Sequence, residues 1–216
     1  MSSSTVRPRV RMTGEQRRRQ LLDVGRELFA QRGFEATSVE ELAAHADVSK
    51  PVVYEHFGGK EGLYGAVVDR EMQALLDRFT SALSVPRPPR EMLESAALVL
   101  LDYIEEDTDG FRVLTRDAPG QSGGASFSSL IGELARKVEH ILAREFGARG
   151  YDPRLAQLYS QALVGMVSLV GEWWLDNRAL GKREVAAHLV NLSYNGLAHL
   201  EPRPGLGDSR RSSPGG

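Results

Sequence analysis

Apolar residues recur at a spacing of about 3.6 along nearly the whole chain, which is the period of an amphipathic helix. No stretch alternates apolar and polar residues for long enough to predict a strand, and no repeat period is visible. The chain has 216 residues, of which 41% are apolar, so it can bury a core without disulfides or metals. We therefore expect an all-α fold of about nine helices.

The ends of the first two helices can be placed from capping patterns. Thr13 and Gln16 have the spacing of a capping box, and Gly33 offers a left-handed stop about five turns later. Ser38 and Glu41 repeat the capping pattern at the start of a second, shorter helix. The pattern predicts two helices joined by a short connection.

A tight turn separates the second helix from a third. Asp47 stands at this turn, and Asp tolerates left-handed backbone geometry. Ser49 is placed to cap the third helix, and Pro51 falls in its first turn, where a missing amide hydrogen costs little. This helix is predicted to end at Phe57, with a break at residues 58–59 before a long fourth helix.

Beyond a stiff proline-rich linker at residues 85–90, the rest of the chain also has helical periodicity. A glycine-rich stretch at 118–129 is predicted to be a flexible loop, and the tail from residue 202 to be disordered. Further helices are expected at about 92–104, 111–116, 130–146, 152–179 and 184–200.

The compartment is predicted from what the sequence lacks. There is no cysteine, which excludes disulfides and thiolate chemistry, and the N-terminal residues do not form the apolar core of a signal peptide. Residues 155–171 carry no formal charge, but polar residues interrupt them, so we interpret them as a helix buried in protein. We expect a cytoplasmic protein with no membrane partner.

Positive charge is concentrated at the start of the chain. The whole chain has a formal net charge of −2, yet residues 1–20 hold six arginines against one glutamate. An arginine-rich arm before an ordered domain is typical of a protein that binds a polyanion, although a solvated leader would have the same composition.

Two short helices joined by a tight turn, at residues 38–57, follow a supporting helix with a basic start. This arrangement is typical of a helix-turn-helix, in which the second short helix lays its N-terminal half in the DNA major groove. The pattern favours a protein that reads double-stranded DNA.

The segment "ELFAQRGFEATSVEELAAHADVSKPVVYEHFGGKEGLY", residues 27 to 64, closely resembles the tetracycline-repressor (TetR) family of bacterial transcriptional regulators. Asp47 is a departure, because members usually have glycine there. The resemblance implies a basic arm at 1–12, a DNA-binding domain at 13–60 and a helical ligand-binding and dimerisation domain at 61–200, followed by a disordered tail at 201–216. It also implies a regulator, most simply a repressor, which a small and largely apolar ligand releases from a palindromic operator.

The resemblance implies roles for residues around the turn. Lys50, Val52 and Val53 are candidates to face bases, while Tyr54 and His56 can donate to phosphates, although His56 can also be an ordinary surface histidine. The cation of Lys60 opposes the dipole of its helix unless a phosphate lies nearby. The full set of candidate DNA-binding residues is Arg17, Thr37, Ser38, Val39, Ser49, Lys50, Pro51, Val52, Val53, Tyr54, His56 and Lys60.

The last two predicted helices have wide apolar faces, which exceed what one small domain would cover. We expect two copies of the chain to pair through them as a four-helix bundle, since a twofold dimer also suits a palindromic site. The candidate interface residues are Leu155, Leu163, Met166, Val170, Val185, Leu189 and Leu192.

The sequence does not identify the effector. Aromatic and apolar side chains on the later helices are candidates to enclose it, and two polar side chains are candidates to orient it. Each of them can equally be ordinary core packing. The candidates are Tyr103, Phe111, Phe127, Leu134, Ile141, Gln161, Glu172 and Trp174.

No pattern in this sequence indicates an enzyme. The five histidines are never four residues apart, no serine stands in a nucleophile-elbow pattern, and we predict no metal and no other cofactor. Three alternatives stay open: a helical small-molecule-binding protein or enzyme without a DNA function, an activator, and a nucleoid-type binder.

Overall fold

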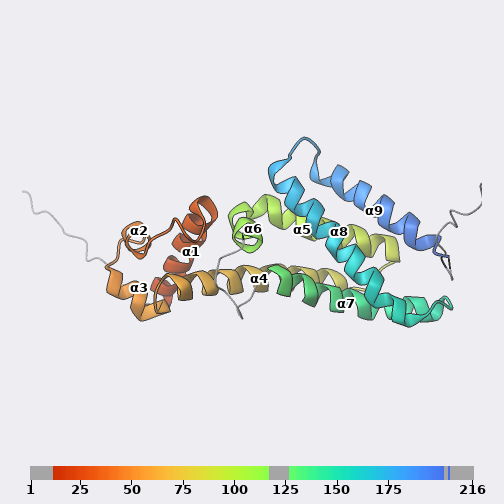
Figure 1. Ribbon diagram of the computed structural model, residues 1–216, viewed down its shortest axis with the longest axis horizontal. Helices are drawn as coiled ribbons and strands as arrows, with labels where there is room; N and C mark the ends of the chain where they lie inside the picture. The colour runs from red at the N-terminus through yellow and green to blue at the C-terminus, as the bar shows by residue number, and fades with distance from the viewer. Residues whose placement is uncertain (1–11, 117–126, 202–203, 205–216) are drawn as a thin grey trace, which may run out of the picture. The chain divides into compact units, whose positions relative to one another are not determined.

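The computed structural model describes residues 12–116, 127–201 and 204 (Figure 1). The predicted arm, glycine-rich loop and tail lie largely outside these residues. Within the described ranges there are nine α-helices and one 3-10 turn, with no strand, which confirms the all-α prediction.

The helices fall close to their predicted positions. A 3-10 turn at Pro153–Leu155 precedes the eighth. In chain order they are α1 (Gly14–Arg32), α2 (Val39–His45), α3 (Lys50–Phe57), α4 (Lys60–Ser84), α5 (Pro89–Glu106), α6 (Thr108–Thr115), α7 (Phe127–Ala148), α8 (Ala156–Asp176) and α9 (Lys182–Ala198).

Both predicted capping boxes are present, at Thr13 and at Ser38. Asp47 has a positive φ of 50°, and Gly58 ends α3 in the left-handed conformation with a φ of 74°. One cap is wrong: Ser49 occupies the N-cap position of α3, but its side chain makes no capping hydrogen bond. The hydroxyl of this exposed serine is therefore not needed by its own helix.

Several boundaries differ from the predictions. Helix α5 begins at Pro89, inside the predicted linker, because proline suits the first turn of a helix. Helix α6 begins before Phe111, because the Asp107 side chain accepts a hydrogen bond from the Gly110 amide and caps it. The helix predicted for 152–179 starts as the 3-10 turn and ends at Asp176.

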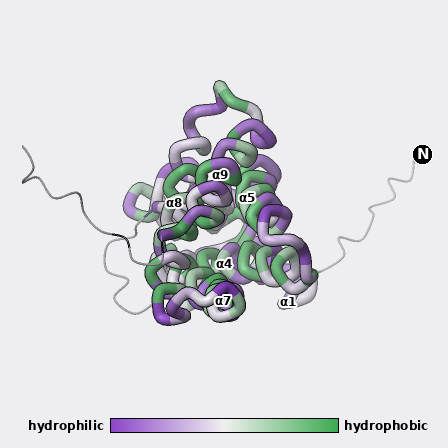
Figure 2. The backbone as a smooth tube through the Cα atoms, turned by 90° about the vertical axis from the view of Figure 1, so that its right-hand side faces the viewer, coloured by the Kyte–Doolittle hydropathy of each residue, from purple (hydrophilic) through white to green (hydrophobic). Residues whose placement is uncertain are grey.

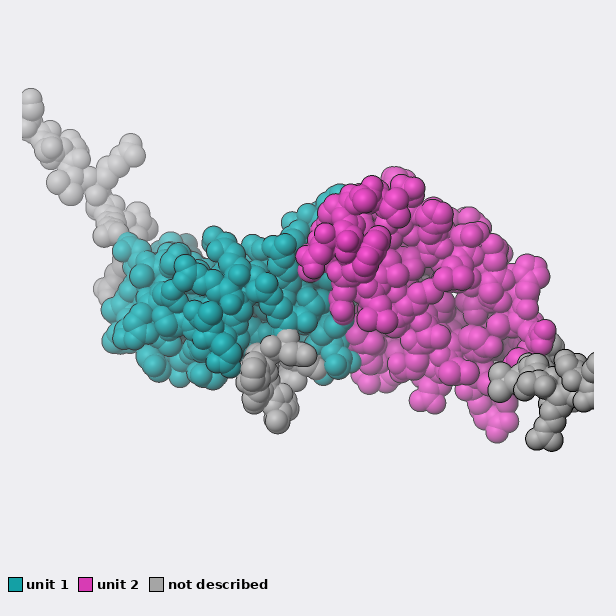
Figure 3. All heavy atoms as spheres, turned by 45° about the horizontal axis from the view of Figure 1, so that its top comes forward, with its two compact units in different colours: residues 1–78, 103–130 teal, residues 79–102, 131–216 magenta. Residues whose placement is uncertain are grey.

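The chain packs as two compact units, which Figure 3 colours separately. Unit 1 comprises residues 1–78 and 103–130, and unit 2 comprises residues 79–102 and 131–216. Helices α4, α5 and α7 contribute residues to both. These two units are defined by how the residues pack. The predicted boundary at residue 60, between a DNA-binding domain and a ligand-binding domain, stays a prediction.

The core of unit 1 joins α1 and the two short helices to the start of α4. Leu21, Leu42 and Val53, from α1, α2 and α3, are completely buried. Beside them the ring of Tyr64 lies edge-on to those of Phe29 and Phe34, with both pairs of centroids 5.0 Å apart. Such pairs add to stability beyond their buried area, so the short helices are held in one position.

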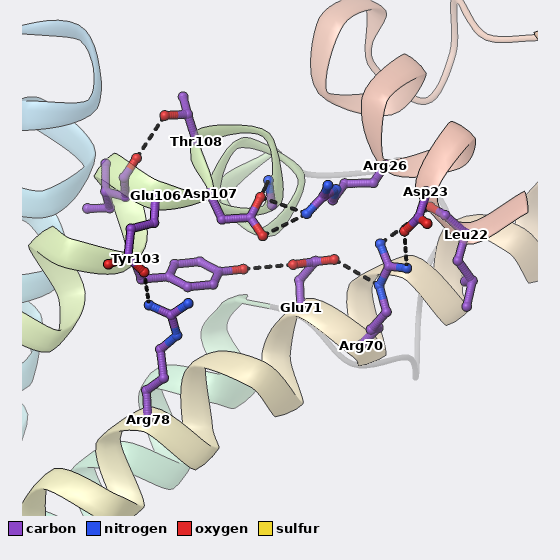
Figure 4. A network of polar contacts seen from close by, with 12 residues as sticks. Leu22, Asp23, Arg26, Arg70, Glu71, Arg78, Tyr103, Glu106, Asp107 and Thr108 are labelled. Atoms are coloured by element: carbon purple, nitrogen blue, oxygen red, sulfur yellow. Dashed lines mark hydrogen bonds and ion pairs between the residues drawn. The ribbon is translucent and has the colours of Figure 1, made fainter. Parts of the chain in front are cut away.

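A polar network in unit 1 connects α1, α4 and α5 with the start of α6 (Figure 4). The buried carboxylate of Glu71 accepts from the Tyr103 hydroxyl at 2.9 Å and from Arg70 at 3.0 Å. Arg26 on α1 donates to both oxygens of Asp107 at 2.7 and 2.8 Å. Charged groups with such partners fix orientation as well as stability, because leaving one unpaired would be costly.

Two glycines in unit 1 permit close approaches. A Cβ added to Gly62 would lie 1.8 Å from the backbone oxygen of Phe57, and one added to Gly110 would lie 2.6 Å from Glu71 Oε2. Neither distance is sterically possible without a shift of the backbone or the network. Glycine at these positions is therefore a packing requirement.

Helices α8 and α9 lie side by side in unit 2 (Figures 1 and 2). Figure 2 shows hydrophobic and hydrophilic residues alternating along the helices, as amphipathic packing requires. Val164 and Trp174 of α8 and Val190 of α9 are buried. Among the described residues, no helix combines the length and apolar character needed to cross a membrane.

Candidate DNA interface, effector cavity and pairing face

Helix α3 is anchored on one side and open on the other. Val53 has no exposed surface, whereas Ser49, Lys50 and Pro51 are exposed and Tyr54 is 54% exposed. The exposed side of α3 and its N-cap therefore present an ammonium, a hydroxyl and an aromatic ring in fixed positions. Lysine can donate to base edges in the major groove, and hydroxyls can donate to phosphate oxygens.

The C-terminal end of α3 is held by a residue that the sequence reasoning missed. Arg18 of α1 donates to the His56 carbonyl oxygen at 3.0 Å, and its guanidinium lies 4.4 Å from the centre of the Phe57 ring. A cation at a helix C-terminus is favourable because it opposes the negative end of the dipole. The charge of Arg18 was visible in the sequence, but no pattern connects it to a carbonyl 38 residues away.

Two of the predicted DNA-binding residues are buried in the protein. Val53 is fully buried and Thr37 is 2% exposed, with its hydroxyl donating to the Gly33 carbonyl at 2.8 Å. Neither side chain is available to a base or a phosphate, so we correct these two assignments. Both instead fix the helices that carry their neighbours.

Lys60 also has a structural partner. Its ammonium donates to the Phe34 carbonyl at 3.0 Å and lies 4.2 Å from the centre of the Phe34 ring. A phosphate is therefore not required to explain a cation at the start of α4. Arg17 donates to Gln20 at 2.6 Å, while Val39, Val52 and His56 are half-buried beside the exposed group.

The second short helix adds a carboxylate next to α3. Glu40, exposed in the first turn of α2, forms an ion pair with Lys50. Its neighbour Glu41 is used differently, because it completes the Ser38 capping box and pairs with Arg32. Sequence reasoning did not single out Glu40, since a pair ten residues apart across a turn has no helical spacing.

Unit 2 contains a cavity of about 130 Å³. Its wall is mostly apolar, and Ile141 is the one predicted ligand residue that lines it. The remaining lining residues are Leu83, Arg87, Pro89, Met92, Leu93, Ala96, Val138, Leu142, Glu145, Phe146, Arg149, Tyr151, Leu163, Tyr194, Leu197 and Ala198.

The other predicted ligand residues lie elsewhere. Tyr103 and Phe111 are fully buried in the core of unit 1, and Phe127 packs edge-on against Phe111 at 5.9 Å. Trp174 is buried and donates from Nε1 to the Leu180 carbonyl at 2.9 Å. None of these four residues lines the cavity, and their assignment as ligand residues stays a prediction. Three more also lie away from the cavity: Leu134 is buried, Gln161 is exposed and Glu172 is half-buried.

One apolar face of α8 is open to solvent. Leu158, Leu169 and Trp173 are 64%, 66% and 48% exposed, and with Ala162 they form a line along the helix that we call the α8 stripe. On α9, Leu192 is 66% exposed. Large apolar side chains grouped on one face indicate a surface that another protein covers.

The predicted pairing residues divide between this surface and the core. Leu192 is exposed, and Leu155, Leu163, Met166 and Val170 are half-buried. Val185 and Leu189 are only 4% and 6% exposed, so they pack within the chain, and we correct their assignment. The α9 periodicity was right, but Val185 and Leu189 of its apolar face pack within the chain.

Comparisons with known proteins agree with this geometry. Residues 21–67 match the model of the TetR family of bacterial regulatory proteins, and residues 89–196 match a tetracycline repressor-like C-terminal domain. The HTH-type transcriptional activator FasR of Mycolicibacterium smegmatis is 30% identical over 196 residues, which are 88% of this chain and 87% of FasR.

Solved structures give the same result. A TetR-like regulator from Rhodococcus sp. RHA1 is 28% identical, with a TM-score of 0.72 over 87% of this chain and 99% of its own. A TetR-family regulator from Streptomyces coelicolor is 26% identical, with a TM-score of 0.66 over 87% and 82% of the two chains. With its helix-turn-helix, its helical second unit and these relatives, the chain belongs to the TetR family and is a DNA-binding transcriptional regulator.

Proposed function

We propose that this protein is a homodimeric repressor that binds a palindromic operator and is released from it by a small, largely apolar ligand held in unit 2. The observation that carries the proposal is the exposed side of α3, with Lys50 and Tyr54 outside and Val53 anchored inside. A rod held in this way can enter a major groove without rearrangement.

The α8 stripe and the small size of the DNA-reading helix support the pairing of two chains. A single eight-residue helix reaches too few bases for useful specificity, whereas two copies related by a twofold axis read half-sites about one helical turn apart. Covering Leu158, Leu169 and Trp173 with a second copy would remove three large apolar side chains from water.

The cavity supports the ligand part of the proposal. A volume of about 130 Å³ is close to that of cavities that accept a benzene-sized molecule. Its polar lining residues, among them Arg87 and Tyr194, can orient such a ligand. A ligand that prefers one dimer geometry would shift operator affinity by its differential affinity for the two states, typically about 1–3 kcal/mol.

A second candidate reverses the sign of regulation. FasR, which is 30% identical to this chain, is named as a transcriptional activator. An activator would use the same DNA interface and cavity, but its operator would lie upstream of the promoter instead of overlapping it. Transcript levels in a deletion strain separate the two, since loss of a repressor raises them and loss of an activator lowers them.

Gel-shift and footprinting assays on the DNA upstream of its own gene test the proposal directly. We expect a protected region of defined length, and an affinity that falls by roughly 0.9 logarithmic units per neutralised phosphate for each tenfold rise in salt. Lys50→Ala should lose specific retardation. Equal binding to operator and unrelated DNA would contradict the proposal.

The ligand step needs a separate experiment. A thermal-shift screen of small apolar molecules should find compounds that raise the melting temperature and change operator affinity. Ala96→Leu, which adds volume at the cavity wall, should remove the response to those compounds while DNA binding persists. Unchanged responses in this variant would place the effector elsewhere.

A further inference from the structure

The ion pair between Glu40 and Lys50 lies on the surface that would face DNA. Glu40 is in the first turn of α2 and Lys50 is the first residue of α3. The two side chains are 59% and 51% exposed, so both remain accessible to a third group. Their head groups form a donor and an acceptor side by side.

Stability does not explain this pair. An ion pair between exposed side chains contributes little to folding, with a median of about 0–1 kcal/mol. Leu42, Ala43 and Val53, which are at most 3% exposed, already hold α2 and α3 in the core of unit 1. A carboxylate beside a DNA-reading lysine also repels phosphates, so on electrostatic grounds alone its presence weakens binding.

The chemistry of the pair matches one base pair better than the other. A lysine ammonium has three donors, of which Glu40 takes one and two remain. In the major groove a G·C pair presents two neighbouring acceptors, N7 and O6 of guanine, followed by the N4 donor of cytosine. An A·T pair instead alternates acceptor, donor and acceptor, and adds the thymine methyl group.

We infer that Lys50 and Glu40 act together to read a G·C base pair in each half-site, with the lysine donating to guanine and the glutamate accepting from the cytosine amino group. This inference rests on the proposed operator binding and adds a residue to it. The pair also limits binding to wrong sequences, because at any other base pair one of the two head groups faces a group it cannot bond.

The protonation state of Glu40 suits this role. The hydrogen bond from the Lys50 ammonium holds the pKa of the Glu40 carboxyl below its ordinary value of 4.5. At neutral pH the group is therefore ionised and can only accept hydrogen bonds, which is what the cytosine amino group requires.

Selection from a pool of random duplexes with the full-length protein gives the test. The preferred duplex is then altered one base pair at a time, and the affinities of the wild type, Glu40→Ala, Glu40→Gln and Lys50→Ala are measured on the set. We expect the wild type to lose about tenfold in affinity when one G·C pair per half-site becomes A·T. Glu40→Ala should keep only about threefold of this preference, because it has lost the acceptor for cytosine while Lys50 can still donate to guanine.

Two further variants sharpen the result. Glu40→Gln should shift the preference at that position toward A·T, since an amide bonds adenine with both its groups. Glu35→Gln removes the same charge from the exposed α1–α2 connection and should change affinity for all duplexes equally. Circular dichroism and thermal melts of each variant would check that the helices are intact.

The inference is overturned if Glu40→Ala keeps the wild-type preference at every position, or if it changes all affinities by one common factor, as Glu35→Gln does. Selection that enriches no sequence at all would overturn the operator proposal itself, and this inference with it. The two failures are therefore distinguishable.

Discussion

Unit 1 and unit 2 are built from the same kind of amphipathic helix but are held together differently. Unit 1 has close contacts that only glycine allows and a network of directional hydrogen bonds around Glu71. Unit 2 has an apolar cavity and an exposed apolar face on α8. The contrast fits the proposal that unit 1 is already fixed in a single chain, whereas unit 2 keeps a cavity for a ligand and a face for a second copy.

The largest expected effect concerns the face that unit 2 leaves open. Leu169→Glu places a charge in the α8 stripe, where pairing would bury it, so the dimer should weaken by at least about a hundredfold. Sedimentation equilibrium measures this, and operator binding should fall with it. The monomer should remain folded, because Leu169 is 66% exposed in the single chain.

Gln157→Glu is the matched control, since it adds the same charge at an exposed position of α8 outside the stripe. A dimer that survives Leu169→Glu would show that pairing uses another surface. Leu189→Glu is not a suitable test, because that side chain is 6% exposed and its replacement would unfold the chain.

The close contact at Gly62 gives the next largest effect. A methyl group there would collide with the Phe57 backbone oxygen at 1.8 Å, so Gly62→Ala should lower the free energy of unfolding by about 3 kcal/mol. In unit 2, Gly132→Ala meets no atom within 4 Å and should be neutral or slightly stabilising. Urea unfolding of both variants measures the difference. Equal losses in the two variants would contradict the view that close glycine contacts matter only in unit 1.

The polar network predicts a smaller loss. Tyr103→Phe leaves one oxygen of the buried Glu71 carboxylate without its hydroxyl donor, so we expect a loss of about 2 kcal/mol in unfolding free energy. Burial, first of all, and the neighbouring Glu71 raise the pKa of Tyr103, so its hydroxyl stays protonated and able to donate.

Tyr194→Phe in unit 2 is the control. This side chain is engaged through its ring, whose centre lies 5.6 Å from the Arg90 guanidinium, and phenylalanine keeps that contact. Its effect should stay within about 0.5 kcal/mol. A loss as large as that of Tyr103→Phe would mean that hydroxyl groups matter equally in both units.

The smallest expected effect is on acid stability. The Ser38 backbone amide, and then the Ser38 hydroxyl and Arg32, hold the pKa of Glu41 below its ordinary value of 4.5. A lowered pKa in the folded state stabilises the protein above pH 4.5, and this contribution is lost as the pH falls through the folded-state pKa.

Glu41→Gln keeps an acceptor for the Ser38 amide but does not titrate. Its unfolding midpoint should therefore change less than that of the wild type as the pH falls below 4.5. Glu35→Gln, which removes an exposed carboxyl of the same unit outside the capping box, is the control. If both variants had the same profile, the capping box would not account for the effect.

Features that depend on neighbouring residues could be predicted from the sequence. The capping boxes at Thr13 and Ser38, the turn at Asp47 and the end of α3 at Gly58 each follow from the residue types within one helical turn. With the family resemblance, these features also predicted the fold, which the structure confirms, and the position of the DNA interface, which stays a prediction.

Features that depend on distant residues could not be predicted. The helical period of α9 gives its apolar face but not whether that face turns to the core, as Leu189 does, or to solvent. Nor does it show that Lys60 bonds a carbonyl 26 residues away, or that Glu40 meets Lys50. The cavity arises where five helices pack, which no single helix reveals.

The two contacts of Asp107 affect how the chain folds while it is being synthesised. Its carboxylate both starts α6, through the Gly110 amide, and binds Arg26, which lies 81 residues earlier. An eight-residue helix is too short to be stable in water by itself, so α6 depends on packing against its neighbours, α1 among them. During synthesis, the reading helices thus leave the ribosome well before the segment that completes their support, and a chain truncated near residue 100 would hold them loosely.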